Sequence, residues 1–376
     1  MNNLNQIRIA WLLPVAWFYW QPTLSEFTKI FPQTKIFTGL WPGFAKGFED
    51  SLTVEEVGEM KYIRLTSRRN FTYLSPNIVS KLLQFKPQVI FADSFRLWTL
   101  FVLLLKPLFK WKIIIAYEGS TPRADRRNST LHLYLRRLMV KGSDAFISNT
   151  EAGKNYLTEI LEVPSNKISV QPYEIPAIQT LLAQPREVEI KPFELQQPVF
   201  IFIGHVVYRK GLNYLLEACN ILKQKGYQNY TLLVIGDGEQ RSEWETYCQE
   251  NDLEAQVIWI GRVNYDYVGD YLRLADVFVL PTLEDTWAVV VSEAMLASKA
   301  VLCSQQAGAS ELVINGENGY VFDPLQPEKL AQLMSQFIDN PHLSQKMGIQ
   351  SQQLMQSYTP EIASQSLAQI VEVLQQ

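Results

Sequence analysis

Cysteine and histidine are scarce in this chain. Its 376 residues include three cysteines, Cys219, Cys248 and Cys303, and three histidines. An odd number of scattered cysteines argues against a disulfide framework and indicates a reducing compartment, so we expect a cytoplasmic protein. No two cysteines have the spacing of metal ligands.

Long apolar runs are also missing. The longest is Leu97–Leu105, far short of the roughly 20 residues that span a bilayer. The start of the chain, Met1–Arg8, is polar and does not resemble a signal peptide. We therefore expect a soluble or peripheral protein. Charged residues make up only 19% of the chain and the net charge is −4, which argues against a general nucleic-acid-binding protein.

One segment reverses the sign of the charge. Between Arg96 and Lys141 there are ten Lys or Arg residues and two acids, Glu118 and Asp125. The same segment contains the apolar stretch Leu97–Trp111. Apolar and basic residues together suit an anionic membrane surface, such as the inner face of a membrane, and we predict that residues 96–141 bind one. An acceptor with a diphosphate or lipid tail would also suit them, as would a core helix followed by a solvated one.

Short apolar runs rich in β-formers alternate with helical patterns, which is typical of βαβ units and parallel sheets. The length suits two domains, so we expect an α/β protein of two doubly wound, Rossmann-like domains facing across a cleft. The predicted strands are Ile7–Leu13, Thr34–Phe37, Tyr62–Leu65, Gln88–Phe91, Lys112–Ala116, Ala145–Ser148, Val199–Ile203, Thr231–Ile235, Val257–Ile260, Val277–Leu280, Ala300–Cys303 and Gly319–Phe322.

The boundary between the domains is predicted in the proline-containing segment Ile175–Gln197, which has little periodicity. We assign residues 1–180 to an acceptor-binding domain, 181–197 to the linker and 198–358 to a donor-binding domain. Residues 359–376 form a predicted C-terminal helix that could pack back on the first domain. Ligands of such sheets lie outside the carboxyl ends of the strands, so the loops there should carry the chemistry.

A carboxylate stands in an apolar helix of the second half. Glu293 lies within a predicted helix at about Trp287–Ala297 that is apolar nearly all round. Such a carboxylate needs a partner, which could be the hydroxyls of a ribose or a structural Lys or Arg. Asp285, eight residues earlier, would suit the N-cap of this helix. The free N–H groups of Thr286, Trp287, Ala288 and Val289 would then form an anion site for a diphosphate.

Two cations follow the first strand of this half. That strand leads to Gly204 and His205, and Arg209 and Lys210 stand just before the next predicted helix. Cations at a helix start oppose its dipole unless an anion binds beside them, although solvated surface cations are the commoner case. The loop Gly261-Arg262-Val263 could offer backbone groups to a base. Gly236-Asp237-Gly238 is explained by a tight turn.

These features occur in an order that resembles family 4 glycosyltransferases, which are retaining GT-B enzymes. The resemblance rests on the runs G-H-V-V-Y-R-K-G, V-I-G-D-G-E, W-I-G-R-V, D-T-W-A-V-V-V-S-E-A-M and G-A-S-E-L-V-I-N-G-E-N-G-Y-V-F-D, between Val199 and Asp323. The N-terminal half is similar in architecture only. The resemblance implies transfer of a sugar from a UDP- or GDP-sugar to a glycan or lipid-linked acceptor, with retention, in cell-surface polysaccharide or glycolipid synthesis.

The resemblance also implies roles for residues. Glu293 would hold the donor ribose, Lys210 would contact a phosphate, and Asp285 would lie near the donor sugar. The family usually has Glu where this chain has Asp285, which leaves Glu284 open as the functional acid. It usually has Arg where this chain has His205, so Arg209 becomes the second cation. The predicted donor contacts are Glu293, Lys210, Arg209, His205, Gly204, Arg262, Val263, Thr286, Trp287, Ala288 and Val289.

The first half offers fewer signals. Glu118, after the strand Lys112–Ala116, stands where many relatives have a histidine near the acceptor, and a carboxylate there could orient or deprotonate an acceptor hydroxyl. The family's glycine-rich loop after the first strand is replaced by aromatic residues, which could stack on a sugar, contact a lipid or pack under the next helix. Trp17, Tyr19 and Arg123 are the predicted acceptor contacts.

The expected mechanism places the diphosphate on Arg209, Lys210 and the backbone amides, which would stabilise charge on the leaving group. No bound metal or cofactor is then expected, in agreement with the lack of any Asp-X-Asp. An alternative from another class is a catalytically silent nucleotide-binding partner in a polysaccharide-synthesis complex. His205 and Asp285, which stand where the family usually has Arg and Glu, permit this alternative.

Overall fold

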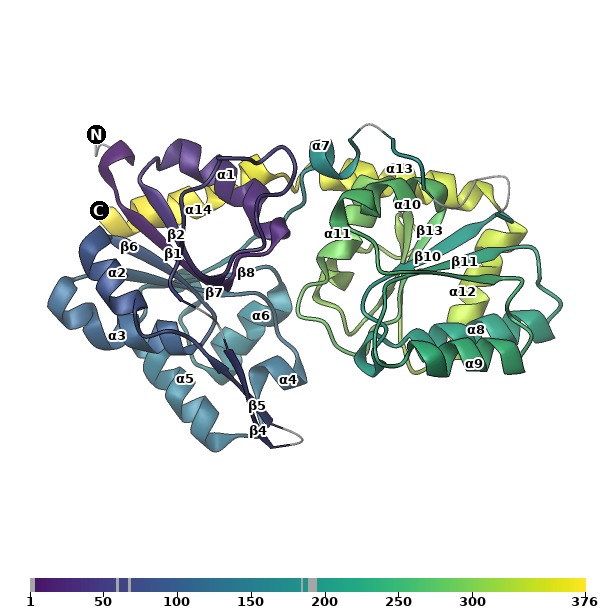
Figure 1. Cartoon of the computed structure of the whole chain (residues 1–376), viewed down its shortest axis with the longest axis horizontal. Helices are drawn as coiled ribbons and strands as arrows, with labels where there is room; N and C mark the ends of the chain where they lie inside the picture. The colour runs from purple at the N-terminus through teal and green to yellow at the C-terminus, as the bar shows by residue number, and fades with distance from the viewer. Residues whose placement is uncertain (1–3, 59–60, 67–68, 184, 189–194) are drawn as a thin grey trace. The chain divides into compact units, whose positions relative to one another are not determined.

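The computed structural model describes residues 4–58, 61–66, 69–183, 185–188 and 195–376. It divides into two compact units (Figure 1). Unit 1 comprises residues 1–175 and 358–376, and unit 2 comprises residues 176–357. The last helix of the chain, α14 (Pro360–Gln375), therefore belongs with the first half of the sequence.

Unit 1 is built on a parallel sheet of seven strands in the order β3-β2-β1-β6-β7-β8-β9. The central strands are continuous apolar runs and are buried, as expected for a parallel sheet covered on both faces. The strands are β1 (Ile9–Val15), β2 (Thr34–Leu40), β3 (Val54–Glu56), β6 (Val89–Asp93), β7 (Lys112–Tyr117), β8 (Ala145–Ser148) and β9 (Ile168–Val170).

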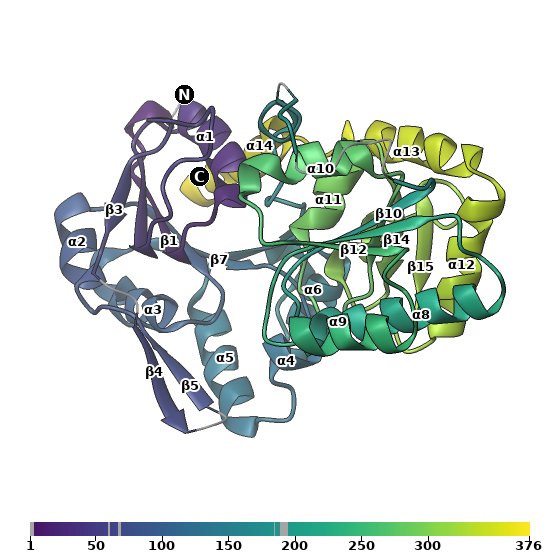
Figure 2. The same ribbon diagram turned by 45° about the vertical axis from the view of Figure 1, so that its right-hand side comes forward.

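Helices cover both faces of this sheet. The helix α1 (Gln21–Ile30) lies beside α14 on one face (Figures 1 and 2), and Leu367 and Val371 of α14 enter the same core as Trp11 and Phe27. The other helices of unit 1 are α2 (Ile78–Phe85), α3 (Leu97–Phe109), α4 (Pro122–Asp125), α5 (Thr130–Gly142) and α6 (Glu151–Asn155). Among these, α2 and α3 close a separate core on the opposite face.

One predicted strand does not join the parallel sheet. The run predicted at Tyr62–Leu65 forms β4 (Lys61–Thr66), which pairs antiparallel with β5 (Arg69–Tyr73) in a hairpin of its own. An apolar run alone does not distinguish a central strand from a hairpin strand. The strands β3, β5 and β9 are absent from the predicted set.

Unit 2 is built on a parallel sheet of six strands in the order β12-β11-β10-β13-β14-β15. All six lie where the sequence predicts strands, and four of them have the predicted bounds. The strands are β10 (Val199–Ile203), β11 (Thr231–Ile235), β12 (Val257–Gly261), β13 (Val277–Leu280), β14 (Ala300–Ser304) and β15 (Gly319–Phe322).

The helices of unit 2 also form two layers. In Figures 1 and 2, α8, α9 and α12 cover one face of the sheet, and α10, α11 and α13 cover the other. The bounds are α7 (Ile178–Leu181), α8 (Leu212–Gln224), α9 (Arg241–Glu250), α10 (Val268–Leu274), α11 (Val289–Leu296), α12 (Pro327–Asp339) and α13 (His342–Met355).

The chain passes from unit 1 to unit 2 between Ile175 and Pro176. Residues 176–181 belong to unit 2 because α7 packs closely against the backbone of α10. A Cβ added at Gly269 of α10 would lie 1.7 Å from the carbonyl oxygen of Leu181. Residues 176–180, which we assign from the sequence to the first domain, therefore lie with the second unit. Part of the predicted linker, 189–194, lies outside the described residues.

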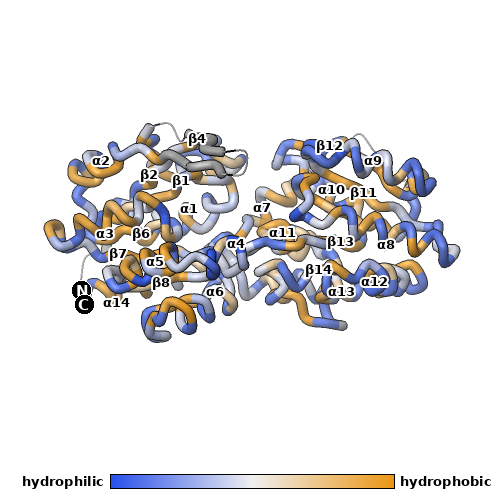
Figure 3. The backbone as a smooth tube through the Cα atoms, turned by 90° about the horizontal axis from the view of Figure 1, so that it is seen from below, coloured by the Kyte–Doolittle hydropathy of each residue, from blue (hydrophilic) through white to orange (hydrophobic). Residues whose placement is uncertain are grey.

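Hydrophobic residues concentrate in the strands of both units and along α3 (Figure 3). In the part of the chain that the structure describes, every helix is too short or too polar to cross a membrane.

Candidate active site

A cavity of about 540 Å³ opens at the carboxyl ends of β10, β11 and β12 in unit 2. This volume is within the usual range for small-molecule sites. Four of the predicted donor contacts, Gly204, His205, Arg262 and Val263, line this unit 2 cavity. Its full lining is Ile203, Gly204, His205, Ile235, Gly236, Asp237, Gly238, Arg262, Val263 and Val268.

Glycines form the floor of the unit 2 cavity. Gly236 N donates to the carbonyl oxygen of Gly261 at 2.8 Å, and Gly204 N donates to that of Ile235 at 2.9 Å. Gly236 has a φ of +133°, and a Cβ added there would lie 1.8 Å from the carbonyl oxygen of Gly204. Only glycine fits such a position. A tight turn explains Gly236-Asp237-Gly238 from the sequence alone, and the structure adds the close backbone approach at Gly236.

Three cations lie near His205, which lines the cavity. Partial burial and the nearby charges of Lys210, Arg209 and Arg262 lower the pKa of His205. His205 is therefore neutral near pH 7, and the positive potential comes from the other three side chains. Such a potential attracts an anionic ligand.

Lys210 and Asp285 form an ion pair with each other. Lys210 Nζ lies 2.5 Å from Asp285 Oδ2, and Arg209 Nη1 lies 4.0 Å from the same oxygen. The family resemblance implies a phosphate contact for Lys210 and a position near the donor sugar for Asp285. It does not imply that the two side chains bind each other, because 75 residues separate them in the chain. The backbone of Asp285 is also fixed, since its N–H donates to Gln306 and its carbonyl accepts from Gly308.

The helix after this loop begins later than predicted. α11 starts at Val289, and its N-cap residue is Ala288 in a left-handed conformation with φ 70° and ψ 68°. Asp285 is therefore not the N-cap, and Thr286 and Trp287 lie outside the helix. Trp287 is fully buried, so it supports the loop from within. A left-handed alanine leaves no signal in the sequence, which explains the error.

Glu293 is buried in the middle of α11, with 5% of its surface exposed. Burial raises the pKa of its carboxyl group to about 7, and a hydrogen bond from Tyr265 opposes the rise. The hydroxyl of Tyr265 donates to Glu293 Oε1 at 2.8 Å. Among the described residues the partner of Glu293 is thus a tyrosine, not the structural Lys or Arg that the sequence left open.

Tyr265 links Glu293 to the unit 2 cavity. It follows Arg262 and Val263, which line the cavity, and precedes Val268, which also lines it. Nothing in the sequence marks Tyr265, because a tyrosine in a polar loop has no distinctive spacing. Four of the eleven predicted donor contacts thus line the cavity. Lys210 and Arg209 lie close enough to lower the pKa of His205, and Glu293 is hydrogen-bonded to Tyr265, which belongs to the same loop as Arg262.

In unit 1, Glu118 follows the carboxyl end of β7, as predicted, and is half-buried. It belongs to a group of acids around the buried Tyr173. Burial and the charges of Glu174, Glu118 and Asp93 raise the pKa of Tyr173 well above its ordinary value. Asp93 ends β6 and pairs with Arg96 at 2.9 Å. Side chains from neighbouring strands thus meet at this edge of the sheet.

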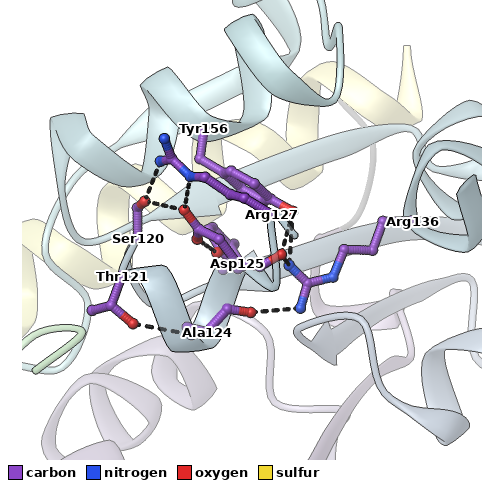
Figure 4. Close-up of polar contacts among 8 residues, drawn as sticks. Ser120, Thr121, Ala124, Asp125, Arg127, Arg136 and Tyr156 are labelled. Atoms are coloured by element: carbon purple, nitrogen blue, oxygen red, sulfur yellow. Dashed lines mark hydrogen bonds and ion pairs between the residues drawn. The ribbon is translucent and has the colours of Figure 1, made fainter. Parts of the chain in front are cut away.

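A polar network supports the loop that follows Glu118 (Figure 4). Asp125 is fully buried and accepts hydrogen bonds from the hydroxyls of Tyr117 and Ser120 and from Arg127 Nε. Arg136 donates to the carbonyl oxygens of Ala124 and Asp125 at 2.7 and 2.8 Å. A buried carboxylate that accepts this many hydrogen bonds fixes the loop firmly. The sequence grouped these residues only as a basic cluster.

The predicted acceptor aromatics divide between surface and core. Trp17 is 43% exposed, whereas Tyr19 is half-buried against the core of unit 1. Trp20 is buried, with its ring centroid 5.1 Å from that of Tyr173. Packing under the next helix thus accounts for part of this aromatic run. Arg123 is exposed at the start of α4.

The arrangement of strands is shared with solved glycosyltransferase structures. The crystal structure of Anabaena Alr3699/HepE in complex with UDP-glucose is similar to this chain with a TM-score of 0.74 and 17% sequence identity, covering 98% of this chain and 100% of that one. WaaG, a glycosyltransferase involved in lipopolysaccharide biosynthesis, has a TM-score of 0.68 at 14% identity, covering 95% and 98%. The chain has the GT-B fold.

The chain also has relatives at the level of sequence. Residues 183–354 match the family described as "Glycosyl transferases group 1". An alpha-D-kanosaminyltransferase of Streptomyces kanamyceticus is 20% identical over 237 residues, 61% of this chain. The amylovoran biosynthesis glycosyltransferase AmsK of Erwinia amylovora is 32% identical over 148 residues, 38% of this chain. The chain spans 60% and 35% of the length of these two relatives.

Acidic, histidine and cysteine side chains do not converge on a metal site within the described ranges, where no group of three or more could hold an ion. The three cysteines are buried and free.

Proposed function

We propose that this GT-B chain is a glycosyltransferase that takes a sugar from a UDP- or GDP-sugar bound in unit 2 and transfers it to a glycan or lipid-linked acceptor bound in unit 1. The observation that carries the proposal is the glycine-lined cavity at the strand ends of unit 2, with three cations near its His205 side chain. A nucleoside diphosphate combines a flat ring with a doubly charged group, and such a cavity suits both.

The comparisons support this choice. The family model covers the unit that contains the cavity, and HepE was solved with UDP and with UDP-glucose. The kanosaminyltransferase and AmsK are named for sugar transfer. From the resemblance to family 4 we further propose retention of configuration and a role in cell-surface polysaccharide or glycolipid synthesis, in the cytoplasm.

In the proposed complex, Glu293 accepts hydrogen bonds from the ribose, and Lys210 and Arg209 contact the diphosphate. An ammonium group has three donors, so Lys210 can hold a phosphate oxygen while it remains paired with Asp285. Its charge would stabilise the leaving nucleotide, and we propose that transfer needs no bound metal. Glu118 would orient the acceptor hydroxyl, and Asp285, or alternatively Glu284, would lie near the donor sugar.

A thermal-shift screen over UDP-, GDP- and ADP-sugars tests the donor site, because a ligand of the folded state raises apparent stability. The protein should be stabilised by one donor class. Glu293→Ala and Lys210→Ala should each lose most of that shift and the transfer activity. Lys225→Ala, at the far end of α8, is the matched control and should behave as wild type. Wild-type affinity and transfer in both site variants would contradict the proposal.

A catalytically silent nucleotide-binding partner is the second candidate. The pairing of Asp285 with Lys210 favours it, since the acid is occupied by a cation. Slow hydrolysis of a nucleotide sugar without acceptor would support the enzyme. Tight binding with no turnover of any donor would support the silent partner.

We also propose that unit 1 binds an anionic membrane surface through α3 and α5. Leu104 and Leu108 of α3 are 67% and 73% exposed, and Leu131, Leu135 and Leu138 of α5 are exposed as well. The two helices are neighbours, because Lys106 of α3 donates to the carbonyl of Gly142. The same segment of the chain carries exposed basic residues, namely Lys110, Arg123, Arg126, Arg127, Arg137 and Lys141. Apolar side chains with a basic rim suit the interface of an anionic bilayer.

Vesicle co-sedimentation tests this surface. Binding to phosphatidylglycerol-containing vesicles should exceed binding to pure phosphatidylcholine and weaken as salt rises. Replacing Leu104 and Leu108 together with serine should reduce it. Leu325→Ser, an exposed leucine of unit 2, should not. Binding that ignores lipid charge and salt would rule out the proposal.

A further inference from the structure

Tyr265 makes an unusual contact for a loop residue. It stands in the short turn Tyr265–Tyr267 between β12 and α10, yet its hydroxyl reaches a buried carboxylate on α11. The bond to Glu293 Oε1 is 2.8 Å long. Burial and the charge of Glu293 raise the pKa of Tyr265 well above its ordinary value. Tyr265 therefore stays protonated and donates this hydrogen bond at any physiological pH.

The two oxygens of Glu293 differ in their surroundings. Oε1 is held by Tyr265, whereas Oε2 accepts no hydrogen bond from any residue that the structure describes. Glu293 keeps 5% of its surface exposed. A carboxylate offers about four acceptor positions, so one oxygen remains for a ligand while the other fixes the orientation of the group.

The same loop contributes to the unit 2 cavity. Arg262 and Val263 line it, and Tyr265 follows two residues later. A segment of four residues thus joins the cavity to the carboxylate on α11. A ligand that orders Arg262 and Val263 would order Tyr265 with them, and through Tyr265 the Glu293 side chain.

We propose that Tyr265 is a positioning residue for nucleotide recognition, which holds Glu293 by Oε1 so that Oε2 is presented to the ribose hydroxyls. This inference rests on the proposed function, because it takes the ribose to be the ligand of Glu293. It adds a residue to the donor site and explains why a costly buried carboxylate is tied to a loop rather than to a cation.

Isothermal titration of UDP and GDP, each beside its 2′,3′-dideoxy counterpart, tests the inference on the full chain. The wild type should prefer the ribose form of the nucleotide that it binds. Tyr265→Phe removes one hydroxyl and keeps the ring, and it should weaken binding by roughly 10- to 150-fold, the value of one lost hydrogen bond to a charged group. The loss should fall on the ribose form, so the preference shrinks.

A pH series gives a readout that a merely structural role would not change. Tyr265 is the titratable group that acts on Glu293 among the described residues, and its hydrogen bond lowers the pKa of Glu293 against the effect of burial. Without that bond the carboxylate ionises at a higher pH. The midpoint for nucleotide binding in Tyr265→Phe should therefore move above that of the wild type.

Two further variants separate the possible outcomes. Tyr267→Phe changes a tyrosine of the same turn that packs against Arg186, and it should bind as wild type. Glu293→Ala should abolish the ribose preference, and adding Tyr265→Phe to it should have no further effect. If Tyr265→Phe keeps wild-type affinity, preference and pH midpoint while Glu293→Ala loses binding, the positioning role is wrong and the donor site stands. If Glu293→Ala also binds as wild type, the proposed function itself fails.

Discussion

At the scale of single residues, Glu293 shows how a site is maintained at a cost to stability. A carboxylate that loses its hydration without gaining a cation destabilises the folded state, and the pKa of about 7 measures that cost. The hydrogen bond from Tyr265 offsets only part of it. A group retained under such conditions is a candidate for function.

Glu293→Gln should therefore stabilise the protein above neutral pH. The pKa of Glu293 in the folded state is raised from 4.5 to about 7. The free energy of unfolding of the wild type therefore falls as the pH rises between these two values, and this loss of stability is constant above pH 7. At pH 8 the variant should gain up to about 3 kcal/mol in free energy of unfolding. The gain should vanish below pH 4.5. Denaturant unfolding at pH 4, 6 and 8 checks this.

The same variant should bind nucleotide more weakly, because an amide accepts hydrogen bonds from a ribose less strongly than a carboxylate does. A gain in stability without loss of affinity would separate the buried carboxylate from the donor site. A loss of stability at pH 8 would show that Glu293 has a cation partner.

At the scale of elements, strands could be predicted more accurately than the loops between them. The strands of unit 2 are buried apolar runs bounded by polar residues, and all six lie where predicted. The late start of α11 depends on a left-handed Ala288 that nothing in the sequence marks. The hairpin β4–β5 was taken for part of the sheet because its apolar run resembles a central strand.

The residues of the candidate site could likewise be predicted where they lie at strand ends, but not where their contacts involve loops. Residues at the ends of predicted strands, such as Gly204, Arg262 and Glu118, lie where expected. The ion pair between Lys210 and Asp285 joins two loops that are 75 residues apart, and the hydrogen bond between Tyr265 and Glu293 joins a loop to the helix α11. Periodicity and spacing carry no information on which side chains from different loops will meet.

The glycine floor gives a prediction at this scale. Gly236→Ala places a Cβ 1.8 Å from the carbonyl oxygen of Gly204 at a φ of +133°. The ends of β10 and β11 must then separate, which should cost at least about 2 to 3 kcal/mol and abolish nucleotide binding.

Gly226→Ala is the matched control, since Gly226 also has positive φ but no atom lies within 4 Å of the added Cβ. Its cost should be only about 1 kcal/mol, with binding intact. Chemical denaturation and titration with nucleotide measure both quantities. Equal effects of the two substitutions would mean that backbone conformation, not the close approach, decides the outcome.

At the scale of the whole molecule, the chain order does not follow the division into units. The last helix, α14, completes the core of unit 1 with Leu367 and Val371, although unit 2 precedes it in the sequence. Damage to this helix should therefore affect the first half of the chain.

Leu367→Ala should destabilise unit 1 by about 2 to 5 kcal/mol, the usual cost of truncating a buried leucine. Hydrogen exchange should accelerate in β1 and α1 and stay unchanged in β10 to β12. Ile362→Ala, at a partly exposed position of the same helix, should have little effect. Nucleotide should slow exchange around β10 to β12 in both variants. Faster exchange of unit 2 alone in Leu367→Ala would contradict the assignment of α14.

The central claim is that a nucleotide sugar binds at the strand ends of unit 2 with its ribose on Glu293. A crystal structure with the nucleotide selected by the thermal-shift screen tests it most directly. We predict ribose hydroxyls within hydrogen-bond distance of Glu293 Oε2, the base in the cavity beside Arg262 and Val263, and the diphosphate on Lys210 and Arg209. A nucleotide bound elsewhere, or one whose ribose does not contact Glu293, would contradict the account.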